Sequence, residues 1–489
     1  MRFGFQHSYA ALPGRFYARV DPTPVADPQL VVLNGPLAED LGLEPEVFEP
    51  VAAAVLSGTQ LPEDAYPIAM AYAGHQFGVF VPQLGDGRAI LLGELKGHDG
   101  RLRDLQLKGA GLTPFSRNGD GRAALGPMLR EYLVSEAMHA LGVPTTRSLA
   151  VATTGEPVLR DRSALPGAVL TRVAASHVRV GTFQHFAARG DQEAVRELLE
   201  YVVARHYPAG AESSQPALAV LRQVAQRQVA LVVDWMLLGF IHGVMNTDNM
   251  AISGETIDYG PCAFMDEYDP KTVFSSIDHS GRYAYANQAL IAQWNLARFA
   301  ESLLFLIDPD PERAVGLATE VVAPFMAQFD DRFLAGMRRK IGLASALDGD
   351  PELVKRLLNA MQHAGADFTL TFRALTFAAQ CGHEASGLRE LFAGSAELDD
   401  WLRDWQRRLT CDPQNGAERV ASMRAVNPAF IPRNHRVQAA LDAADRGDYG
   451  PFRKLHGILQ RPYDEQAGVD EYSRPPQPAE RVLQTFCGT

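Results

Sequence analysis

The sequence is poor in several features that would assign its class directly. It has only four cysteines in 489 residues, without the paired spacing of a metal site and too few for a disulfide framework. No apolar run approaches the ~20 residues of a membrane span, and even the stretch 231–241 carries Asp234. Lys and Arg number 46 against 58 Asp and Glu, and the net charge of −12 argues against general nucleic-acid binding.

The N-terminal residues have neither the apolar core of a secretory signal nor the Arg- and Ser-rich composition of a transit peptide. We therefore expect a cytoplasmic protein with no nucleic-acid or membrane partner. The hydrophobic fraction of 46% is ordinary for a globular protein, and the length predicts about two to four domains. Since no coiled coil or unpaired edge strand stands out, we expect a monomer.

One stretch carries most of the chemistry. His242-Gly243 precedes the pair Asp248-Asn249, and Asp258-Tyr259-Gly260 follows. Kinase-like folds place their catalytic loop and second metal-binding Asp in this order. We expect residues 250–253 and 255–257 to form a short hairpin that brings Asn249 and Asp258 side by side. Their oxygens would face one cation, for which Mg²⁺ and Mn²⁺ are equally suitable.

Upstream, a series of predicted strands contains phosphate-binding candidates. A strand at 74–84 is followed by the turn Gly85-Asp86-Gly87-Arg88, then by strands at 89–95 and 104–109. A Gly-x-Gly turn lets backbone amides approach phosphates, and Arg88 adds a positive charge. A plain hairpin turn explains the same residues, and Ile90 stands where protein kinases have a third glycine.

Lys108 ends the last of these strands, where a kinase-like fold keeps the lysine that pairs with phosphates. A helix starting near Gly126 carries Glu131 and Glu136, about 140° apart around its axis, so only one of them can face Lys108. We favour Glu131 as the supporting ion pair, without excluding Glu136. Arg172 and Arg179 flank the expected hinge between two lobes.

Helical patterns dominate after residue 181. The expected fold class is α+β, a protein-kinase-like two-lobed fold with a β-rich N-lobe and a large helical C-lobe. The predicted parts are an N-terminal arm (1–65), the N-lobe (66–180), the C-lobe (181–435) and C-terminal helices with a tail (436–489). Expected helices cover 192–206, 218–241, 287–306, 311–341, 351–364, 368–379, 396–409 and 437–444.

One departure from the kinase pattern bears on mechanism. In protein kinases the catalytic Asp precedes the metal-binding Asn by five residues, and here that position is Val244. A valine cannot accept a proton. Either the chain is a catalytically inactive binder, or Asp248, the only carboxylate in this loop, serves as the base.

Taken together, these motifs make the chain resemble the SelO (YdiU-like) family of pseudokinases over essentially its full length. The matching segments are 73–78, 83–88, 107–109, 120–122, 242–250 and 427–435. The resemblance implies a protein adenylyltransferase that binds ATP flipped relative to kinases, so that the α-phosphate faces the acceptor. AMP would pass to Ser, Thr or Tyr hydroxyls of protein substrates.

The resemblance also implies roles for individual residues. Asp248 would be the catalytic base, and Asn249 and Asp258 would bind Mg²⁺, with Asp258 also at the nucleotide. The other expected ATP contacts are Lys108, Arg172 and Arg179 at the distal phosphates, with Gly85, Gly87, Arg88, Asp120 and Gly121 elsewhere on the nucleotide.

The four cysteines divide into two groups. Cys381 and Cys411 are expected to be idle thiols. The family often has selenocysteine near its C-terminus, and Cys487 occupies the third-from-last place here. We hypothesise a regulatory disulfide between Cys262 and Cys487, which resembles a bridge in relatives.

Two other functions stay open on the sequence alone. His-Gly loops also occur in small-molecule kinases, so an ATP-dependent phosphotransferase acting on a protein or a small molecule is one alternative. A non-catalytic pseudokinase scaffold is the other, because the usual base is missing.

Overall fold

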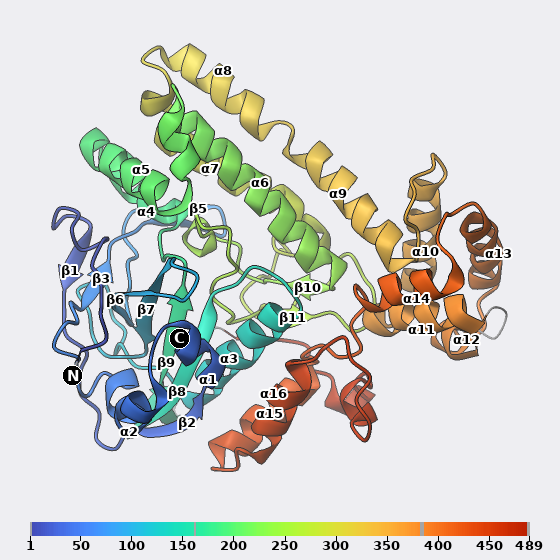
Figure 1. Cartoon of the computed structure of the whole chain (residues 1–489), viewed down its shortest axis with the longest axis horizontal. Coiled ribbons are helices and arrows are strands. Elements are labelled where there is room, and N and C mark those ends of the chain that lie inside the picture. Colours follow the sequence, from blue (N-terminus) through green and yellow to red (C-terminus); the bar gives the residue numbers. More distant parts are fainter. Residues whose placement is uncertain (1, 161–162, 382–385, 487–489) are drawn as a thin grey trace.

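The computed structural model describes residues 2–160, 163–381 and 386–486. One half of the molecule contains a β-sheet and the other is built from helices (Figure 1). The α+β class is thus confirmed.

A seven-stranded sheet forms the first half, and all its neighbouring strands are antiparallel in the order β1-β3-β6-β7-β9-β8-β2. Lys108 lies in the middle of this sheet, opposite Ala89 on one side and Leu170 on the other. The strands are β1 (Tyr17–Arg19), β2 (Gln29–Leu33), β3 (Ile68–Met70), β6 (Ala89–Lys96), β7 (Leu102–Lys108), β8 (Arg147–Arg160) and β9 (Ser163–Ala174).

The first residues of the chain extend this sheet. β1 and β2 are its two outer strands, and helices α1 (Gly35–Asp40) and α2 (Pro45–Leu56) follow them. Leu56 of α2 packs in one buried cluster with Leu107 of the sheet. The N-terminal residues therefore help to bury the strand that carries Lys108.

The prediction of one strand at 74–84 is wrong, because two short strands form a hairpin there. β4 (Gly74–Gln76) pairs with β5 (Val79–Val81) through a turn at Phe77 and Gly78. Both turn residues have positive φ, 52° and 84°, which glycine adopts easily and which an apolar run does not predict. This hairpin contacts Asn246 and Thr247 in the loop 242–250 that is predicted to be catalytic, which we call the catalytic loop.

Helices cover the sheet and build the second half. α3 (Leu125–Ala140) contacts β8 and β9, and α15 (Asn434–Asp445) and α16 (Gly450–Leu459) pack on α3. The remaining helices are α4 (Val180–Ala187), α5 (Gln192–His206), α6 (Pro216–Leu237), α7 (Gln288–Ile307), α8 (Pro311–Val322), α9 (Phe325–Lys340), α10 (Asp350–Ala364), α11 (Phe368–Cys381), α12 (Ser386–Leu391), α13 (Ala396–Thr410) and α14 (Gly416–Arg424).

Two expected helices need correction. The helix expected at 311–341 is two helices, α8 and α9, that meet at Pro324. Proline removes a backbone donor and clashes with the preceding turn, so a continuous helix is unfavourable there. The helix expected to reach 241 ends at Leu237, because Gly239 turns the chain with a φ of 73°.

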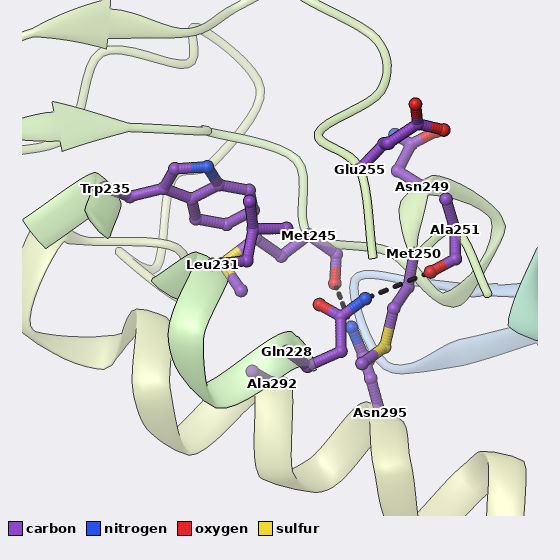
Figure 2. Close-up of a pocket in the computed structure, with 10 residues that line it drawn as sticks. All are labelled: Gln228, Leu231, Trp235, Met245, Asn249, Met250, Ala251, Glu255, Ala292 and Asn295. Carbon is purple, nitrogen blue, oxygen red and sulfur yellow. Dashed lines mark hydrogen bonds between the residues drawn. The ribbon is translucent and has the colours of Figure 1, made fainter. Parts of the chain in front are cut away.

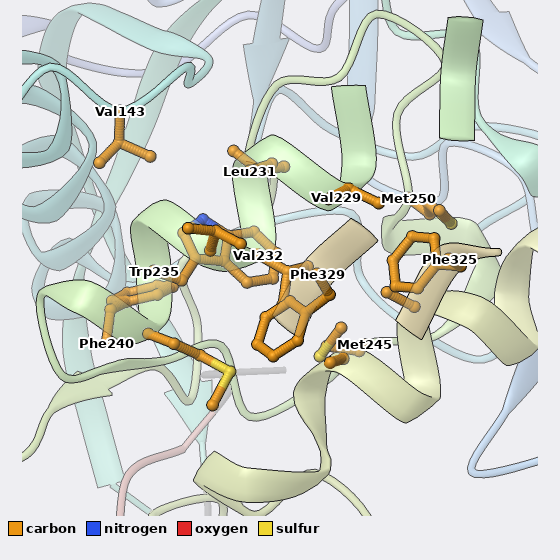
Figure 3. Close-up of a cluster of buried hydrophobic side chains, with 14 of the residues drawn as sticks. Val143, Val229, Leu231, Val232, Trp235, Phe240, Met245, Met250, Phe325 and Phe329 are labelled. Atoms are coloured by element: carbon orange, nitrogen blue, oxygen red, sulfur yellow. The ribbon is translucent and has the colours of Figure 1, made fainter. Parts of the chain in front are cut away.

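The main core lies directly beneath the catalytic loop (Figure 3). Trp235 of α6 and Phe329 of α9 belong to this core, together with Met245 and Met250 of the loop. Burial of these loop side chains fixes the polar residues between them in position.

Among the described residues, one helix is long and apolar enough to span a membrane, Tyr285–Ile307, with a mean hydropathy of 1.2. This corrects the expectation that no such run exists. The segment includes α7, which packs against α4, α6 and α8 and buries Leu296 and Phe299. A core helix of a globular protein has the same composition.

A buried lysine gives a test of the helical packing. Lys340 is 2% exposed, its Nζ lies 4.3 Å from the centre of the Phe372 ring, and no carboxylate of the described residues is within 4 Å. Burial lowers the pKa of Lys340 from 10.5 to about 7. Between these pH values the folded protein binds fewer protons than the unfolded chain, so its stability rises with pH.

We therefore expect Lys340→Met to raise the free energy of unfolding by on the order of 2 kcal/mol at pH 7. The gain should be largest at or below pH 7 and shrink toward pH 10. Urea unfolding at pH 6, 7.5 and 9 measures this, with exposed Lys355→Met as the control. A gain that does not vary with pH would contradict the proposed cost of burying the charge.

Candidate active site

Two short strands close the catalytic loop at its base. β10 (Phe240–Ile241) pairs with β11 (Ala263–Phe264), so that residues 242–262 form one excursion between them. Buried His242 spans the excursion, because its Nε2 lies 3.0 Å from the carbonyl oxygen of Ile257 and its Nδ1 accepts from Val244 N at 3.3 Å. Burial lowers the pKa of His242, which keeps the ring neutral and suited to this structural role.

Asn249 and Asp258 lie side by side, as the spacing predicts, but not through the expected hairpin. Asn249 Nδ2 is 3.3 Å from Asp258 Oδ2. The strands expected at 250–253 and 255–257 do not pair with each other. Ala251 bridges to Arg179, and Thr256 bridges to Thr145. Backbone groups of other segments compete for these hydrogen bonds, and sequence spacing does not reveal them.

These two side chains have the chemistry of a magnesium site. Asn249 Nδ2 also donates to the Val244 carbonyl at 3.1 Å, which leaves its Oδ1 as the end that can bind a cation. Mg²⁺ is commonly held by one or two protein oxygens together with substrate phosphates. In the part of the chain that is described, no group of three or more His, Cys, Asp or Glu residues forms a metal site, so Asn249 and Asp258 fit only this phosphate-assisted mode.

Asp258 is held in a conformation that few residues other than glycine adopt. Its φ is 71°, and its Oδ1 accepts from Lys108 Nζ at 2.9 Å. Burial alone would raise the pKa of Asp258, but the charge and hydrogen bond of Lys108 outweigh it and, with Arg172, hold the pKa below its ordinary value. Asp258 is therefore an ionised carboxylate, as a cation ligand must be.

Lys108 joins the sheet, α3 and the catalytic loop. Its Nζ donates to Glu131 at 2.5 Å as well as to Asp258. Glu136 faces elsewhere and pairs with Arg147 at 2.7 Å. The question that helix geometry left open is resolved in favour of Glu131 as the partner of Lys108.

Arg172 and Arg179 extend this charged cluster. Arg172 donates to Glu131 at 3.2 Å and to Gln106 at 2.6 Å. Arg179 donates to the Asp248 carbonyl at 2.9 Å, and its guanidinium lies 4.5 Å from the centre of the Tyr72 ring. Both arginines are buried. Lys108, Arg172 and Arg179 thus come together around one end of the loop.

The glycine turn after β5 is packed against another loop. A Cβ placed on Gly85 would lie 2.3 Å from the Phe115 ring, and one on Gly87 would lie 3.0 Å from the Phe115 carbonyl oxygen. Asp86 between them is buried and accepts from Gln106 at 3.1 Å. The Arg88 carbonyl accepts from Gly109 N at 2.7 Å, which links this turn to the residue after Lys108.

None of the contacts described for Asp120 and Gly121 involves Lys108, Arg172 or Arg179. Asp120 pairs with Arg160 at 2.8 Å near the surface, and this hydrogen bond and charge lower the pKa of Asp120. Gly121 has a φ of 70°, and a Cβ there would lie 2.2 Å from the Gly111 backbone. These contacts keep the loop after β7 closely packed.

Asp248 is buried in a tight space between two glycines. A Cβ on Gly74 would lie 2.4 Å from Asp248 Oδ1, and one on Gly181 would lie 3.3 Å from Asp248 Cα. Gln76 donates to Asp248 Oδ2 at 3.4 Å, whereas Oδ1 has no hydrogen-bond partner in the described structure. Burial raises the pKa of Asp248 to about 6, although the nearby Arg179 opposes the shift.

Sequence reasoning missed the contribution of the β4–β5 hairpin to this site. His75 N donates to Thr247 Oγ1 at 2.7 Å, and Phe77 N donates to Asn246 Oδ1 at 3.1 Å. The hairpin therefore holds the two residues that precede Asp248. The signal was the Gly-His-Gln-Phe-Gly sequence at 74–78, in which two polar residues lie between glycines inside an apolar run.

A small cavity of about 10 Å³ lies under the loop (Figure 2). Gln228 donates to the Ala251 carbonyl and Asn295 to the Met245 carbonyl, both at 3.0 Å. The Oδ1 of Asn295 is buried without a partner in the described structure. The cavity has room for about one water molecule and none for a nucleotide.

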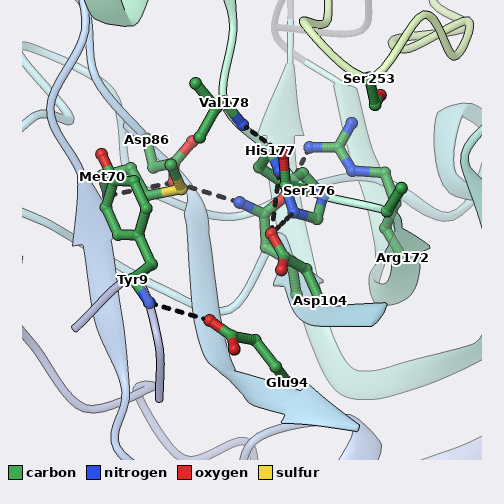
Figure 4. A network of polar contacts seen from close by, with 12 residues as sticks. Tyr9, Met70, Asp86, Glu94, Asp104, Arg172, Ser176, His177, Val178 and Ser253 are labelled. Carbon is green, nitrogen blue, oxygen red and sulfur yellow. Dashed lines mark hydrogen bonds and ion pairs between the residues drawn. The ribbon is translucent and has the colours of Figure 1, made fainter. Parts of the chain in front are cut away.

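A buried polar network connects the sheet to the segment 176–178 that follows β9 (Figure 4). Asp104 accepts from His177 N at 2.8 Å and from Arg205 at 2.9 Å. Glu94 pairs with Arg205 at 3.0 Å and accepts from Tyr9 N at 3.0 Å. Arg205 therefore links the carboxylate that holds Tyr9 to the carboxylate that holds His177.

The segment at 427–435 is structural. Arg433 is 1% exposed and forms ion pairs with Asp266 at 2.5 Å and Asp367 at 2.8 Å. It fastens the acidic segment after β11 to the start of α11. His435 is buried, and the structure describes no hydrogen bond to its ring.

Two cysteines can be placed with their side chains. Cys262 is buried, which raises the pKa of its thiol to about 12, and Cys411 is exposed. Cys487 and the side chain of Cys381 lie outside the described residues. The hydroxyl of Thr485 donates to the Pro261 carbonyl at 2.6 Å, so the tail reaches the backbone next to Cys262.

Comparison with known proteins supports the class that this site indicates. The family model described as "Protein adenylyltransferase SelO" matches residues 1–460. A "Protein nucleotidyltransferase YdiU" of Rhizobium meliloti (strain 1021) is 61% identical over 488 residues, covering 100% of this chain and 99% of the relative. The protein of the same name from Bradyrhizobium sp. (strain ORS 278) is 61% identical over 491 residues and is covered completely.

The site and these similarities define an enzyme that transfers nucleotides to proteins. The chain belongs to the SelO family of protein adenylyltransferases. The sequence resemblance is confirmed over the whole chain, and ATP is the nucleotide substrate that adenylyl transfer implies.

The contact between Gly74 and Asp248 can be tested directly. We expect Gly74→Ala to displace Asp248 and lower nucleotidyl transfer about 100-fold, since a misplacement of ~1 Å at a reacting group has this effect. Transfer is measured with ATP labelled on the α-phosphate. Gly316→Ala, in α8 with open space around it, is the matched control. Equal activity of the two variants would contradict the importance of this contact.

Proposed function

We propose that the chain transfers AMP from ATP to Ser, Thr or Tyr hydroxyls of protein substrates, on a kinase-like two-lobed fold that holds ATP in the flipped orientation. The observation that carries the proposal is the position of the carboxylates. Val244 occupies the place of the usual kinase base, whereas Asp248 is buried beside Arg179, with one oxygen that has no hydrogen-bond partner among the described residues. The reacting phosphorus must then lie near Asp248.

The division into a sheet half and a helical half supports the two-lobed fold. Lys108 and Glu131 come from the sheet and the helix packed on it, whereas Asn249 and Asp258 come from the helical half. Kinase-like folds contribute the same groups from the same halves. We retain the division at residues 65, 180 and 435 as part of this proposal.

In the proposed reaction, the oxygen of the acceptor hydroxyl forms a bond to the α-phosphorus. The bond between that phosphorus and the oxygen bridging to the β-phosphate breaks, and pyrophosphate leaves. Asp248 accepts the hydroxyl proton. No other carboxylate lies in the loop between His242 and Asn249.

The cations bind and orient the nucleotide. Lys108, Arg172 and Arg179 hold the distal phosphates, and they are already positioned by Glu131, Gln106 and the Asp248 carbonyl. Such preorganised charges stabilise a leaving pyrophosphate without reorganising during the reaction.

The remaining nucleotide contacts are assigned to the packed loops. Gly85, Gly87, Arg88, Asp120 and Gly121 contribute further contacts along ATP. Asn249 and Asp258 hold Mg²⁺, with Mn²⁺ as a possible replacement because oxygen ligands suit both. When bound, the metal supplies charge neutralisation to the phosphates.

We further propose that the protein is a cytoplasmic monomer without nucleic-acid or membrane partners. A regulatory disulfide between Cys262 and Cys487 belongs to the same proposal, although Cys487 lies outside the described residues. It is supported by Thr485, two residues earlier, which donates to the carbonyl beside Cys262.

Two labelled nucleotides test the reaction. We expect protein label from ATP carrying ³²P at the α-phosphate and none from ATP carrying it at the γ-phosphate. Label only from the γ-phosphate would make the chain a phosphotransferase. No label from either, with intact nucleotide binding, would make it a scaffold.

The proposed metal ligands have a separate test. Asp258→Ala removes the only carboxylate of the pair, and we expect a loss of at least ~1,000-fold in metal-dependent labelling. Mn²⁺ binding followed by electron paramagnetic resonance should weaken in parallel. The control is the exposed Asp348→Ala. Full labelling by the Asp258 variant would remove this residue from the site.

A further inference from the structure

A cluster of two arginines and a tryptophan lies beside the catalytic loop on the helical half. The guanidinium carbon of Arg282 lies 4.9 Å from the centre of the Trp294 ring, and that of Arg298 lies 5.0 Å from it. Trp294 and Arg298 belong to α7, whereas Arg282 comes from the loop before it. We call these three residues the arginine–tryptophan cluster.

Two sets of contacts fix this cluster close to Asp248. The ring of Trp294 lies 5.2 Å from the ring of His75, whose backbone donates to Thr247. Tyr283, the residue after Arg282, donates from its hydroxyl to Asn246 at 2.6 Å. Each route reaches a residue within two positions of the proposed base.

Arg282 also lies against the β4–β5 hairpin. A Cβ built on Gly78 would be 3.5 Å from the Arg282 guanidinium carbon. The next residue, Val79, is 68% exposed. A charged group and an exposed apolar side chain thus lie together at the edge of the site.

The charge on Arg282 is uncompensated. Among the described residues no carboxylate lies within 4 Å of its guanidinium, whereas Arg298 pairs with Glu301 at 2.5 Å. The nearby Asp278 accepts instead from the backbone amides of Arg282 and Tyr283, at 2.9 and 2.8 Å. In a chain with a net charge of −12, an unpaired arginine at this position is unexpected.

A purely structural role accounts for only part of Arg282. Its guanidinium packs over Trp294, and its Nε is buried without a hydrogen-bond partner in the described structure. The side chain remains partly exposed. Its terminal nitrogens are therefore the donors that can bind a group arriving from solution, and a carboxylate matches them best.

We propose that the arginine–tryptophan cluster binds an acidic side chain of the acceptor protein and thereby selects hydroxyls that have Asp or Glu nearby in the sequence. The proposal rests on the adenylyl transfer proposed above. An extended segment advances about 3.3 Å per residue, so we look for the carboxylate at the positions that flank the hydroxyl in the sequence. The Lys108, Arg172 and Arg179 cluster, which is paired with protein groups on the sheet side, is left to the nucleotide.

The test uses synthetic peptides with one central Ser, Thr or Tyr and with Glu, Gln or Lys at the three positions on each side. With Mg²⁺ and α-labelled ATP, we expect the wild type to prefer Glu over Gln peptides by about tenfold in kcat/KM, and to use Lys peptides least. Arg282→Gln should abolish the preference for Glu, so that the kcat/KM values of Glu and Gln peptides become about equal. Arg282→Glu should favour Lys peptides. Arg313→Gln, at an exposed arginine on α8, should keep the wild-type preference.

The outcomes separate this inference from the proposed function. An equal Glu-to-Gln ratio for the wild type and Arg282→Gln, with label still transferred, overturns the role of the cluster and leaves adenylyl transfer standing. Absence of α-label on every peptide and on whole-cell protein overturns the proposed function, and this inference with it. ATP-dependent protection in thermal melts verifies that each variant is folded, and Arg282→Gln keeps the test valid should the charge reversal fail to fold.

Discussion

The structure depends on one buried contact, the lysine amine that two carboxylates share. Lys108 is supplied by the middle of the sheet, Glu131 by the helix packed on the sheet, and Asp258 by the end of the catalytic loop. Removing Lys108 would leave Glu131 with Arg172 alone and would deprive Asp258 of the ion pair that Lys108 supplies, which is destabilising for buried charges. The two halves are therefore held in register by the same charges that are proposed to receive the nucleotide.

A second constraint is the shortage of space around Asp248. Gly74 and Gly181 lie where any Cβ would collide with the loop or its supports. The carboxylate is thus positioned by shape, with a single long hydrogen bond from Gln76. Its burial follows from the hairpin that covers it, so the hairpin is part of the site although it carries no charged residue.

Much of this arrangement could be predicted from sequence order, and the rest could not for identifiable reasons. The neighbourhood of Asn249 and Asp258 followed from their spacing, and the placement of Lys108 followed from an alternating strand. The hairpin predicted between Asn249 and Asp258 was wrong, because Ala251 and Thr256 pair with segments about 70 and 110 residues away. The contacts of Trp294 and Arg282 with the β4–β5 hairpin were not predicted, because only the folded chain brings α7 and the loop before it to this hairpin.

The contacts of the C-terminal tail bear on the placement of purification tags. Thr485 is buried and exchanges backbone hydrogen bonds with Phe274 and Ser276, in the segment that follows the catalytic loop. Leu483 and Phe486 on either side of it are exposed. A purification tag fused after residue 489 would be attached only four residues beyond this anchored threonine.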